Sequence, residues 1–152
     1  MMVTDSGFEA MHNILMGDMK QIYTESVIDH ATNPRHVGSL VDADGFAISH
    51  SDCGENMEIW LQVKNNRIED IRFWSDGCAA TIACGSMVSE LARGKNVVDA
   101  LKINEEDAIK AFGGLPEGNF HCATLAVNTL KEAIADYLAL KKDPWKKVYR
   151  RK

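Results

Sequence analysis

The sequence predicts an α+β domain in which helices cover one side of a small, three-stranded antiparallel sheet. Apolar and polar residues alternate over residues 57–64, which is the two-residue period of a half-buried strand, and a tight turn leads from there into a further strand over 67–74. From residue 80 onward the apolar residues recur at helical spacing, so the strands come first along the chain and most helices follow. With 152 residues, 45% of them hydrophobic, the chain is long enough for one such domain with its own core.

The N-terminal part contains one predicted helix. Residues 1–18 show little sustained periodicity, and we expect a loose extension there. The spacing of Met19, Tyr23, Val27 and His30 predicts a helix that begins at Met19. It must end near Asn33, because Pro34 disfavours helical geometry in the residue before it.

Three strands are predicted next. A short strand is expected over residues 46–51, ahead of the strands at 57–64 and 67–74. Asn65 and Asn66 lie between those segments, and asparagine tolerates a tight turn. The last two strands therefore form an antiparallel hairpin.

Helices are predicted for most of the remaining chain. A stripe at helical spacing marks the first of them, and Gly94 closes it. The residues of this stripe are Ala80, Cys84, Met87 and Leu91. Asn104 can cap a second helix, with Asp107 three residues on, and Gly113–Gly114 ends it. A long last helix begins near His121 and has one apolar face. That face comprises Leu130, Ala133, Ile134, Tyr137 and Leu138.

The charge of the chain is unevenly distributed. The last twelve residues, 141–152, hold seven of the 17 basic side chains and a single acid, so we treat them as a basic C-terminal tail. The other 140 residues carry ten basic and 21 acidic side chains, a net charge of −11. An acidic body argues against a nucleic-acid channel. No 18-residue apolar run and no basic segment before an apolar one is present, so we expect neither a membrane span nor a signal peptide, and a cytoplasmic protein.

The four cysteines differ in their predicted positions. Without a secretory signal they are metal-binding, reactive or buried thiols rather than disulfides. Cys53 falls in the loop between the first two strands, Cys78 between the sheet and a helix, and Cys122 in the first turn of the last helix. We call these three the candidate ligand cysteines. Cys84 lies in the apolar stripe, roughly 120° around the helix axis from Cys78, and is predicted to be a core residue.

Two further side chains accompany the candidate ligand cysteines. Glu55 follows Cys53 by two residues, and His121 directly precedes Cys122. Thiolates with an imidazole and a carboxylate are the kind of set that holds zinc or an iron-sulfur cluster. The spacing contains no C-x-x-C pair, however. Two alternatives therefore remain, in which His121 is an ordinary residue at the start of a helix and Glu55 is a solvated acid.

The local sequence favours reactive thiols. Cys122 at a helix N-terminus is expected to meet the positive end of the helix dipole, which lowers a thiol pKa, and Cys78 is placed similarly. Gly54 and Gly77 flank two of the thiols and let a backbone or a ligand approach closely.

Four stretches in order resemble the IscU/NifU-type iron-sulfur cluster assembly scaffolds. They are IYTESVIDHATNPRHVG (22–38), DCGENM (52–57), IEDIRFWSDGCAATIACGSMVSELARGK (68–95) and HCATLAVNTLKEAIADY (121–137). The resemblance covers roughly residues 19–140. It implies the IscU/NifU N-terminal fold for a single scaffold domain over that range.

The resemblance also implies a function and a set of site residues. By it, the candidate ligand cysteines match the cluster ligands, His121 matches the histidine before the third cysteine, and Glu55 stands where most members carry aspartate. A non-catalytic scaffold of this kind assembles a cluster, [2Fe-2S] in our expectation, from iron and from sulfur that a cysteine desulfurase delivers. It then transfers the cluster to apo iron-sulfur proteins. Assembly of the chain into a homodimer is a further alternative, and zinc could bind to the same ligands in the purified protein.

The chain departs from the family pattern in one segment. The chaperone-recognition segment of many members, leucine-proline-proline-valine-lysine, reads Leu115-Pro116-Glu117-Gly118-Asn119 here, so we do not expect a dedicated Hsp70-type chaperone as a partner. Two alternatives stay open: a zinc-dependent sulfurtransferase of the SufU type, and a structural zinc module. Only 43 residues separate Cys78 from Cys122, without the insertion usual in SufU proteins, which favours the scaffold.

Overall fold

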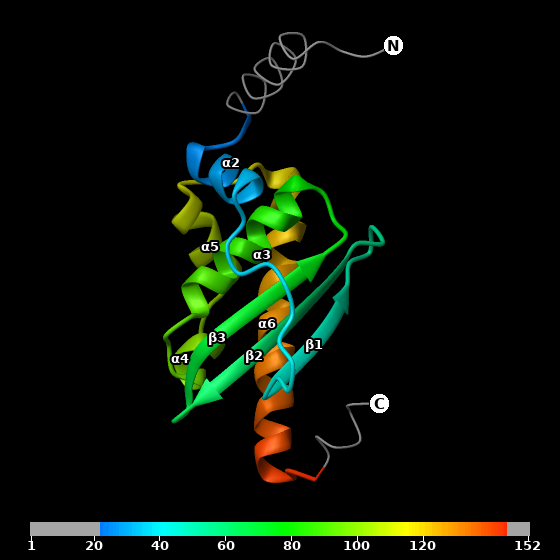
Figure 1. Cartoon of the computed structure of the whole chain (residues 1–152). Coiled ribbons are helices and arrows are strands. Elements are labelled where there is room, and N and C mark those ends of the chain that lie inside the picture. The colour runs from blue at the N-terminus through cyan, green and yellow to red at the C-terminus, as the bar shows by residue number, and fades with distance from the viewer. Residues whose placement is uncertain (1–21, 146–152) are drawn as a thin grey trace, which may run out of the picture.

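The computed structural model describes residues 22–145 and contains one antiparallel sheet in the order β1-β2-β3. The strands are β1 (Gly45–His50), β2 (Asn56–Lys64) and β3 (Arg67–Ser75). One helix, α2 (Glu25–Thr32), precedes the sheet. The elements after it are α3 (Ala79–Ala92), α4 (Val97–Leu101), α5 (Glu105–Phe112), the 3₁₀ turn η1 (Glu117–Asn119) and α6 (Phe120–Lys142) (Figure 1). The predicted α+β class and the helices on one side of the sheet are confirmed.

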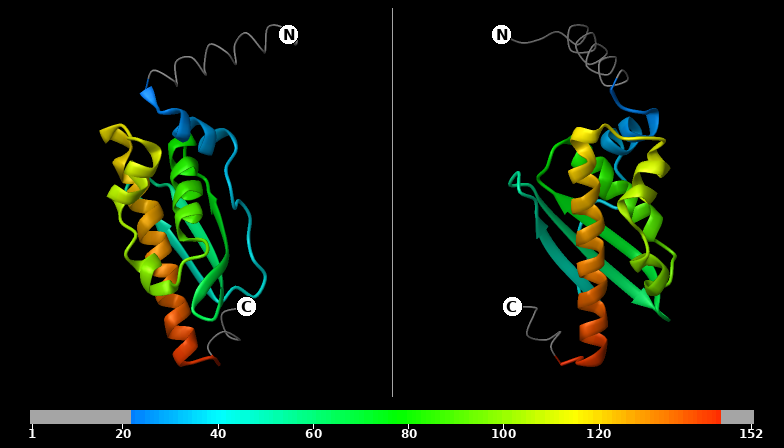
Figure 2. Two further views of the ribbon diagram at one scale, coloured as in Figure 1. Left: turned by 90° about the vertical axis from the view of Figure 1, so that its left-hand side faces the viewer. Right: turned by 180° about the vertical axis from the view of Figure 1, so that it is seen from behind.

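The core lies between the sheet and the helical layer (Figure 2). Helix α6 packs against β1 and β2, and α3 packs against β3. Three cross-strand rows face the helices: Gly45–Leu61–Ile71, Ala47–Ile59–Phe73 and Ser49–Met57–Ser75. At Gly45 a Cβ would lie 2.5 Å from the Ala133 carbonyl oxygen, so glycine lets α6 approach β1 closely.

The hairpin turn between β2 and β3 forms as predicted. Asn65 and Asn66 both take left-handed backbone angles, with φ of 55° and 60°, which is the conformation that such a two-residue turn requires. The Asn66 side-chain oxygen accepts hydrogen bonds from Tyr137 Oη (3.0 Å) and Lys141 Nζ (2.8 Å). The turn therefore fixes the C-terminal part of α6 against the sheet.

Two of the predicted helices match the structure closely. Arg93 and Gly94 end α3, and Gly94 has a positive φ. Asn104 caps α5 through a reciprocal capping box with Asp107, and Gly113 ends it in the left-handed conformation. Cys84 is fully buried in the core, as predicted.

Three details of the helix prediction are wrong. Tyr23 lies in a bend, and α2 begins only at Glu25, because the Thr24 hydroxyl caps it by accepting from Val27 N–H (3.2 Å). The sequence pattern missed α4, which has only five residues and therefore too few positions to show a period. Leu138 is 41% exposed rather than part of the buried face of α6.

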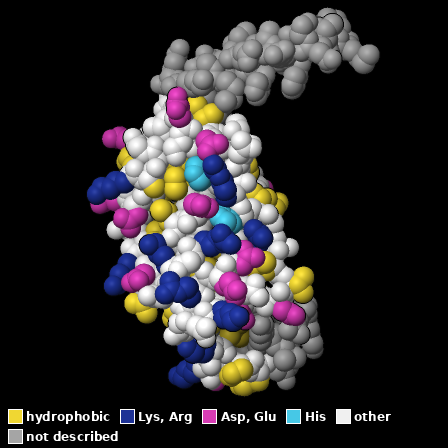
Figure 3. Space-filling model, turned by 60° about the vertical axis from the view of Figure 1, so that its left-hand side comes forward, with side chains coloured by type: hydrophobic (Ala, Val, Ile, Leu, Met, Phe, Trp, Pro, Cys, Tyr) yellow, Lys and Arg dark blue, Asp and Glu magenta, His cyan; other side chains and the backbone are white. Residues whose placement is uncertain are grey.

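The surface carries both signs of charge. In the view of Figure 3, acidic and basic side chains are interspersed instead of forming the single basic stripe that is typical of nucleic-acid binding. Within residues 22–145, every helix is too short or too polar to cross a membrane. The proposed loose extension, residues 1–18, lies outside the described residues.

Candidate metal centre

A tight loop connects β1 to β2 and sets the position of Glu55. Ser51 N–H donates to the Glu55 carbonyl (2.8 Å), and Glu55 N–H donates to the Ser51 hydroxyl (3.1 Å). Gly54 has a φ of +85° with open space around it, so the loop closes there without steric cost. Cys53 is exposed in this loop, which extends from the body beside the β3–α3 connection (Figure 1).

A polar clamp joins this loop to the connection between β3 and α3. The Asp76 carboxylate accepts from Asn56 N–H (2.8 Å) and from the Asn56 side-chain amide (2.9 Å). These hydrogen bonds hold the pKa of Asp76 below its usual range. The Ser75 hydroxyl also donates to the Asn56 carbonyl (2.6 Å). Two of the three cysteine-bearing segments are therefore fixed to each other.

The Glu55 carboxylate caps helix α3. Cys78, the N-cap residue, donates its N–H to Glu55 Oε1 (3.3 Å), and the Thr81 hydroxyl donates to Oε2 (2.9 Å). The Cys78 side chain makes no capping hydrogen bond of its own and is exposed. A carboxylate from another loop thus supplies the acceptor and the negative charge that a helix N-terminus favours.

Helix α6 supplies the remaining candidate ligands from its first turn. His121 Nε2 lies 3.5 Å from Cys122 Sγ, and one ligand atom each from Glu55, His121 and Cys122 lies within 4.8 Å of the other two. Ligand atoms around a tetrahedral zinc stand roughly 3.3–3.8 Å apart, given metal–ligand bonds of about 2.0–2.3 Å. The three groups fit a metal ion after small side-chain movements.

The structure brings the other two candidate ligand cysteines to the same end of the sheet, at different distances from this group. Cys78 Sγ lies 3.5 Å from the Thr81 hydroxyl, which in turn lies 3.3 Å from Cys122 Sγ. Cys53 does not belong to the Glu55–His121–Cys122 group within the described part of the chain.

The predicted lowering of the Cys122 pKa is wrong. Cys122 is fully buried, and burial raises the pKa of its thiol even though hydrogen bonds from Thr81 and Asn119 act in the opposite direction. The neighbouring Cys78 and Glu55 also raise this pKa, since their negative charges disfavour a second anion. Burial likewise raises the pKa of the Cys84 thiol.

Two polar residues at this centre were not found from the sequence. Thr81 is fully buried between Glu55 and Cys122, and Asn119 places its side-chain amide 4.0 Å from Cys122 Sγ. Tyr23 Oη donates to Asn119 Oδ1 (3.0 Å), which connects the start of the described chain to the centre. The only signal available was the position of Thr81, one helical turn after Cys78.

Gly77 is needed here for a different reason from the predicted one. A Cβ at this position would lie 2.7 Å from the Thr81 Cβ. The glycine therefore makes room for Thr81 rather than for a ligand.

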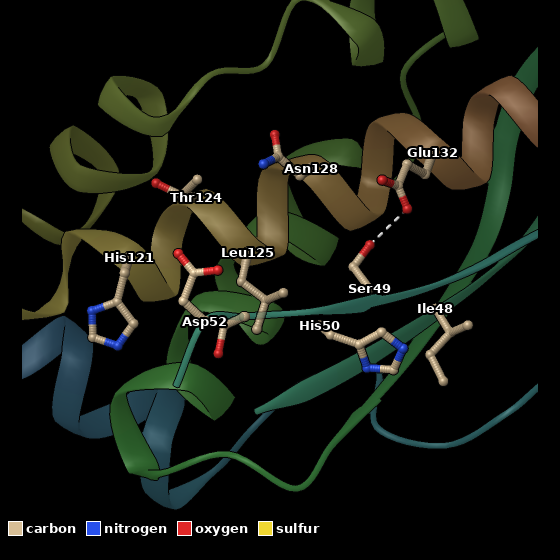
Figure 4. A pocket seen from close by; sticks show the side chains of 10 residues that line it. Ile48, Ser49, His50, Asp52, His121, Thr124, Leu125, Asn128 and Glu132 are labelled. Atoms are coloured by element: carbon tan, nitrogen blue, oxygen red, sulfur yellow. Dashed lines mark hydrogen bonds between the residues drawn. The ribbon is translucent and has the colours of Figure 1, made fainter. Parts of the chain in front are cut away.

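An open hollow of about 480 Å³ between β1 and α6 adjoins the imidazole side of the centre. His121 and Asp52 lie at one end of it, and the hydrogen bond from the Ser49 hydroxyl to Glu132 (2.7 Å) lies at the other (Figure 4). His121 is exposed, so a partner or an incoming ion can reach its ring from this side.

Comparison with known proteins supplies a family. The model of the NifU-like N terminal domain matches residues 22–144. The chain is 48% identical over 117 residues to the iron-sulfur cluster assembly scaffold protein IscU 1 of Archaeoglobus fulgidus, covering 76% of both chains. It is 42% identical over 119 residues to the IscU scaffold protein of Aquifex aeolicus, again covering 76% of each.

A solved structure agrees at the level of the fold. The N-terminal NifU-like protein from Brucella abortus gives a TM-score of 0.62 at 21% identity, covering 80% of this chain and 97% of that one. This likeness concerns the fold alone.

Proposed function

This chain belongs to the NifU-like N-terminal domain family, and we propose that it is a scaffold on which an iron-sulfur cluster is assembled and from which the cluster is passed on. The observation that carries the proposal is the convergence of Glu55, His121 and Cys122 within 4.8 Å, with the Thr81 hydroxyl bridging Cys78 to Cys122 through two contacts. The protein is a scaffold rather than an enzyme, because the cluster is its cargo and no substrate is turned over.

The proposed ligands are the candidate ligand cysteines with either His121 or Glu55 as the fourth. Four such groups complete a [2Fe-2S] cluster, whose irons accept thiolate and imidazole ligands. The same set would hold zinc in the purified protein, since three sulfurs and one nitrogen or oxygen suit a tetrahedral ion. Cys53 must move inward for this, and its exposed loop contains the Gly54 turn that leaves space for such a movement.

Sulfur would enter through an exposed thiol. We propose that the thiolate of Cys53 or Cys78, both exposed, attacks the outer sulfur of a desulfurase persulfide. That attack breaks the persulfide S–S bond, releases the desulfurase thiolate and leaves the persulfide on the scaffold. A separate donor must then supply two electrons to reduce the carried sulfur to sulfide.

Glu55 would keep the cluster exchangeable. Carboxylate oxygen is a hard ligand, and iron-sulfur clusters favour soft sulfur ligands, so a carboxylate is the weakest member of this set. It also has a competing position, since it accepts from Cys78 N–H and Thr81 when it caps α3. A ligand with a stable alternative position favours release of the cargo.

The proposed partners are a cysteine desulfurase as sulfur donor and apo iron-sulfur proteins as recipients, in the cytoplasm. Lys141 and Lys142 of the basic tail belong to α6, at the opposite end of that helix from Cys122. We propose that the tail, with its positive charge on an acidic body, contacts a partner through charge. Removing residues 143–152 should then reduce the salt dependence of desulfurase binding, and an unchanged dependence would count against this role.

Anaerobic reconstitution with ferrous iron, cysteine and a cysteine desulfurase tests the proposed function. The scaffold gives visible iron-sulfur absorption, and Mössbauer spectra of the product give the cluster type. A zinc-dependent sulfurtransferase would instead turn over persulfide with zinc bound and form no cluster. A structural zinc module would do neither, and would unfold when a chelator removes the zinc.

A further inference from the structure

The Thr81 hydroxyl occupies the centre of the candidate site without being a ligand candidate. It lies 2.9 Å from Glu55 Oε2, 3.3 Å from Cys122 Sγ and 3.5 Å from Cys78 Sγ. The side chain has no exposed surface, so water cannot serve as its partner. One buried oxygen thus contacts residues from the β1–β2 loop, α3 and α6.

A hydroxyl has one proton to donate, which limits what Thr81 can do at any moment. An ionised carboxylate only accepts hydrogen bonds, and so does a metal-bound thiolate, whereas a free thiol can also donate weakly. In this structure both the Glu55 oxygen and the Cys122 sulfur lie where Thr81 can donate to them, so two acceptors compete for its one proton. Thr81 cannot donate to Glu55 and to a Cys122 thiolate together.

The shorter of the two contacts identifies Glu55 as the partner that Thr81 favours in this structure. The 2.9 Å separation from Glu55 Oε2 is that of a good hydrogen bond to a carboxylate, and it adds to the bond from Cys78 N–H that holds the other oxygen. A metal ion or cluster binds the Cys122 sulfur as a thiolate, which is a stronger acceptor than the neutral thiol. A buried thiolate gains from a donor, and Thr81 is close enough to supply it.

We propose that Thr81 is a positioning residue that exchanges its hydrogen-bond acceptor when the cargo binds, from Glu55 in the metal-free scaffold to Cys122 Sγ in the loaded one. The exchange releases Glu55 from α3 at the moment when a carboxylate is needed near the metal. On unloading, Glu55 recovers the hydrogen bond and is drawn away from the metal. This inference rests on the proposed function, in that Cys122 must be a ligand.

The test uses Co²⁺ as a spectroscopic probe on the full chain. Thr81→Val removes the hydroxyl at nearly constant shape, Thr81→Ser keeps it, and Thr129→Val is a matched control. Thr129 is a fully buried threonine of α6 whose hydroxyl donates to Leu125 O (2.6 Å) and to nothing in the site. Chelator competition gives the Co²⁺ affinity, and the sulfur-to-cobalt charge-transfer band reports on the thiolates themselves.

Thr81→Val should weaken Co²⁺ binding by about 10–100-fold, which is usual for loss of a group that supports a metal ligand. It should also move the charge-transfer band to longer wavelength, because a thiolate without a hydrogen bond donates charge more easily. Thr81→Ser should restore both, and Thr129→Val should change neither. If Thr81→Val does not fold, Thr81→Ala removes the same hydroxyl without adding a methyl group.

The dependence on Glu55 gives a second readout. Because Glu55 and Cys122 share the one proton of the Thr81 hydroxyl, the effect of the double variant Thr81→Val/Glu55→Ala on the rate of Co²⁺ release should differ from the sum of the two single effects. Additive effects, or a Thr81→Val protein with the wild-type affinity and spectrum, would overturn the proposal. A wild-type protein that binds no Co²⁺ through sulfur would instead refute the proposed function.

Discussion

Gly77→Ala should damage metal binding as well as stability, although residue 77 is not a candidate ligand. A Cβ there would lie 2.7 Å from Thr81 Cβ and Cγ2 and 3.0 Å from its hydroxyl, where ordinary contacts measure 3.4–4 Å. One of the two residues must therefore move by about 0.7 Å. Thr81 is β-branched and buried in the first turn of α3, so it has no free rotamer into which to turn aside.

The displacement is large compared with the contacts that it disturbs. The Thr81 hydrogen bond to Glu55 measures 2.9 Å and the contact with Cys122 measures 3.3 Å, so a shift of this size away from either one breaks it. Overpacking of this kind costs about 1–3 kcal/mol of unfolding free energy. For a chain of this size each kcal/mol lowers the melting temperature by roughly 2–4 °C. The Co²⁺ affinity should fall by about tenfold or more.

Thermal unfolding of the metal-free protein and chelator-competition titration with Co²⁺ measure the two effects separately. Gly85→Ala is the matched control, because its Cβ would lie 2.6 Å from two ring carbons of Phe73, deeper along α3 in the core. It should lose stability similarly while the folded protein keeps its affinity. Gly118→Ala meets no atom within 4 Å and should change neither quantity. A Gly77→Ala protein that loses stability but binds Co²⁺ like the wild type would refute the reasoning.

Four further changes test the centre and its surroundings. Serine in place of any candidate ligand cysteine should sharply lower cluster occupancy, whereas Cys84→Ser should keep occupancy and lower stability by about 1–3 kcal/mol by burying a hydroxyl. Glu55→Ala should slow timed cluster transfer to an apo-ferredoxin and Glu55→Asp should not; equal rates for Glu55→Ala and wild type contradict the exchangeable-ligand idea. Burial lowers the pKa of His30, so folding favours its neutral form, and the unfolding free energy should decrease as pH falls below about 6.5, less so in His30→Gln. Deleting residues 1–18 should leave the melting temperature and Co²⁺ binding unchanged, and a loss of either would show that this segment is part of the domain.

The sequence predicted the elements whose pattern is long or whose turn chemistry is specific. The alternating strand β2, the Asn65–Asn66 turn and the Asn104 capping box all appear in the structure. Local sequence signals failed where a tertiary contact determines the end of an element. The Thr24 hydroxyl donates to Phe112 O (2.7 Å), 88 residues away, at the point where α2 begins, and no periodicity in α2 reveals that bond.

The structure brings Glu55, His121 and Cys122 together, three of the five residues in the predicted site, but their environment was not predictable from the sequence. Position in the chain was enough to separate Cys84 from the other three cysteines. It could not reveal the burial of Cys122, which reverses the expected direction of its pKa shift, because burial depends on how α6 packs against α3 and the sheet. Thr81 was missed for the same reason, since a threonine inside an apolar helix has no distinguishing pattern.

The arrangement of the thiols shows how one site could both hold a cluster and give it up. Two candidate ligand cysteines are exposed and one is buried, so in the proposed scaffold partners would reach the first two and Cys122 would anchor the cargo from inside the fold. Glu55 stands between these roles. When it binds metal it must leave the N-terminus of α3, and losing a capping acceptor costs typically about 1 kcal/mol. That cost opposes loading and favours release. It acts only on the carboxylate ligand, so a cluster ligated by His121 would be held more firmly than one ligated by Glu55. The choice between these two ligands would then determine how easily the cluster is transferred.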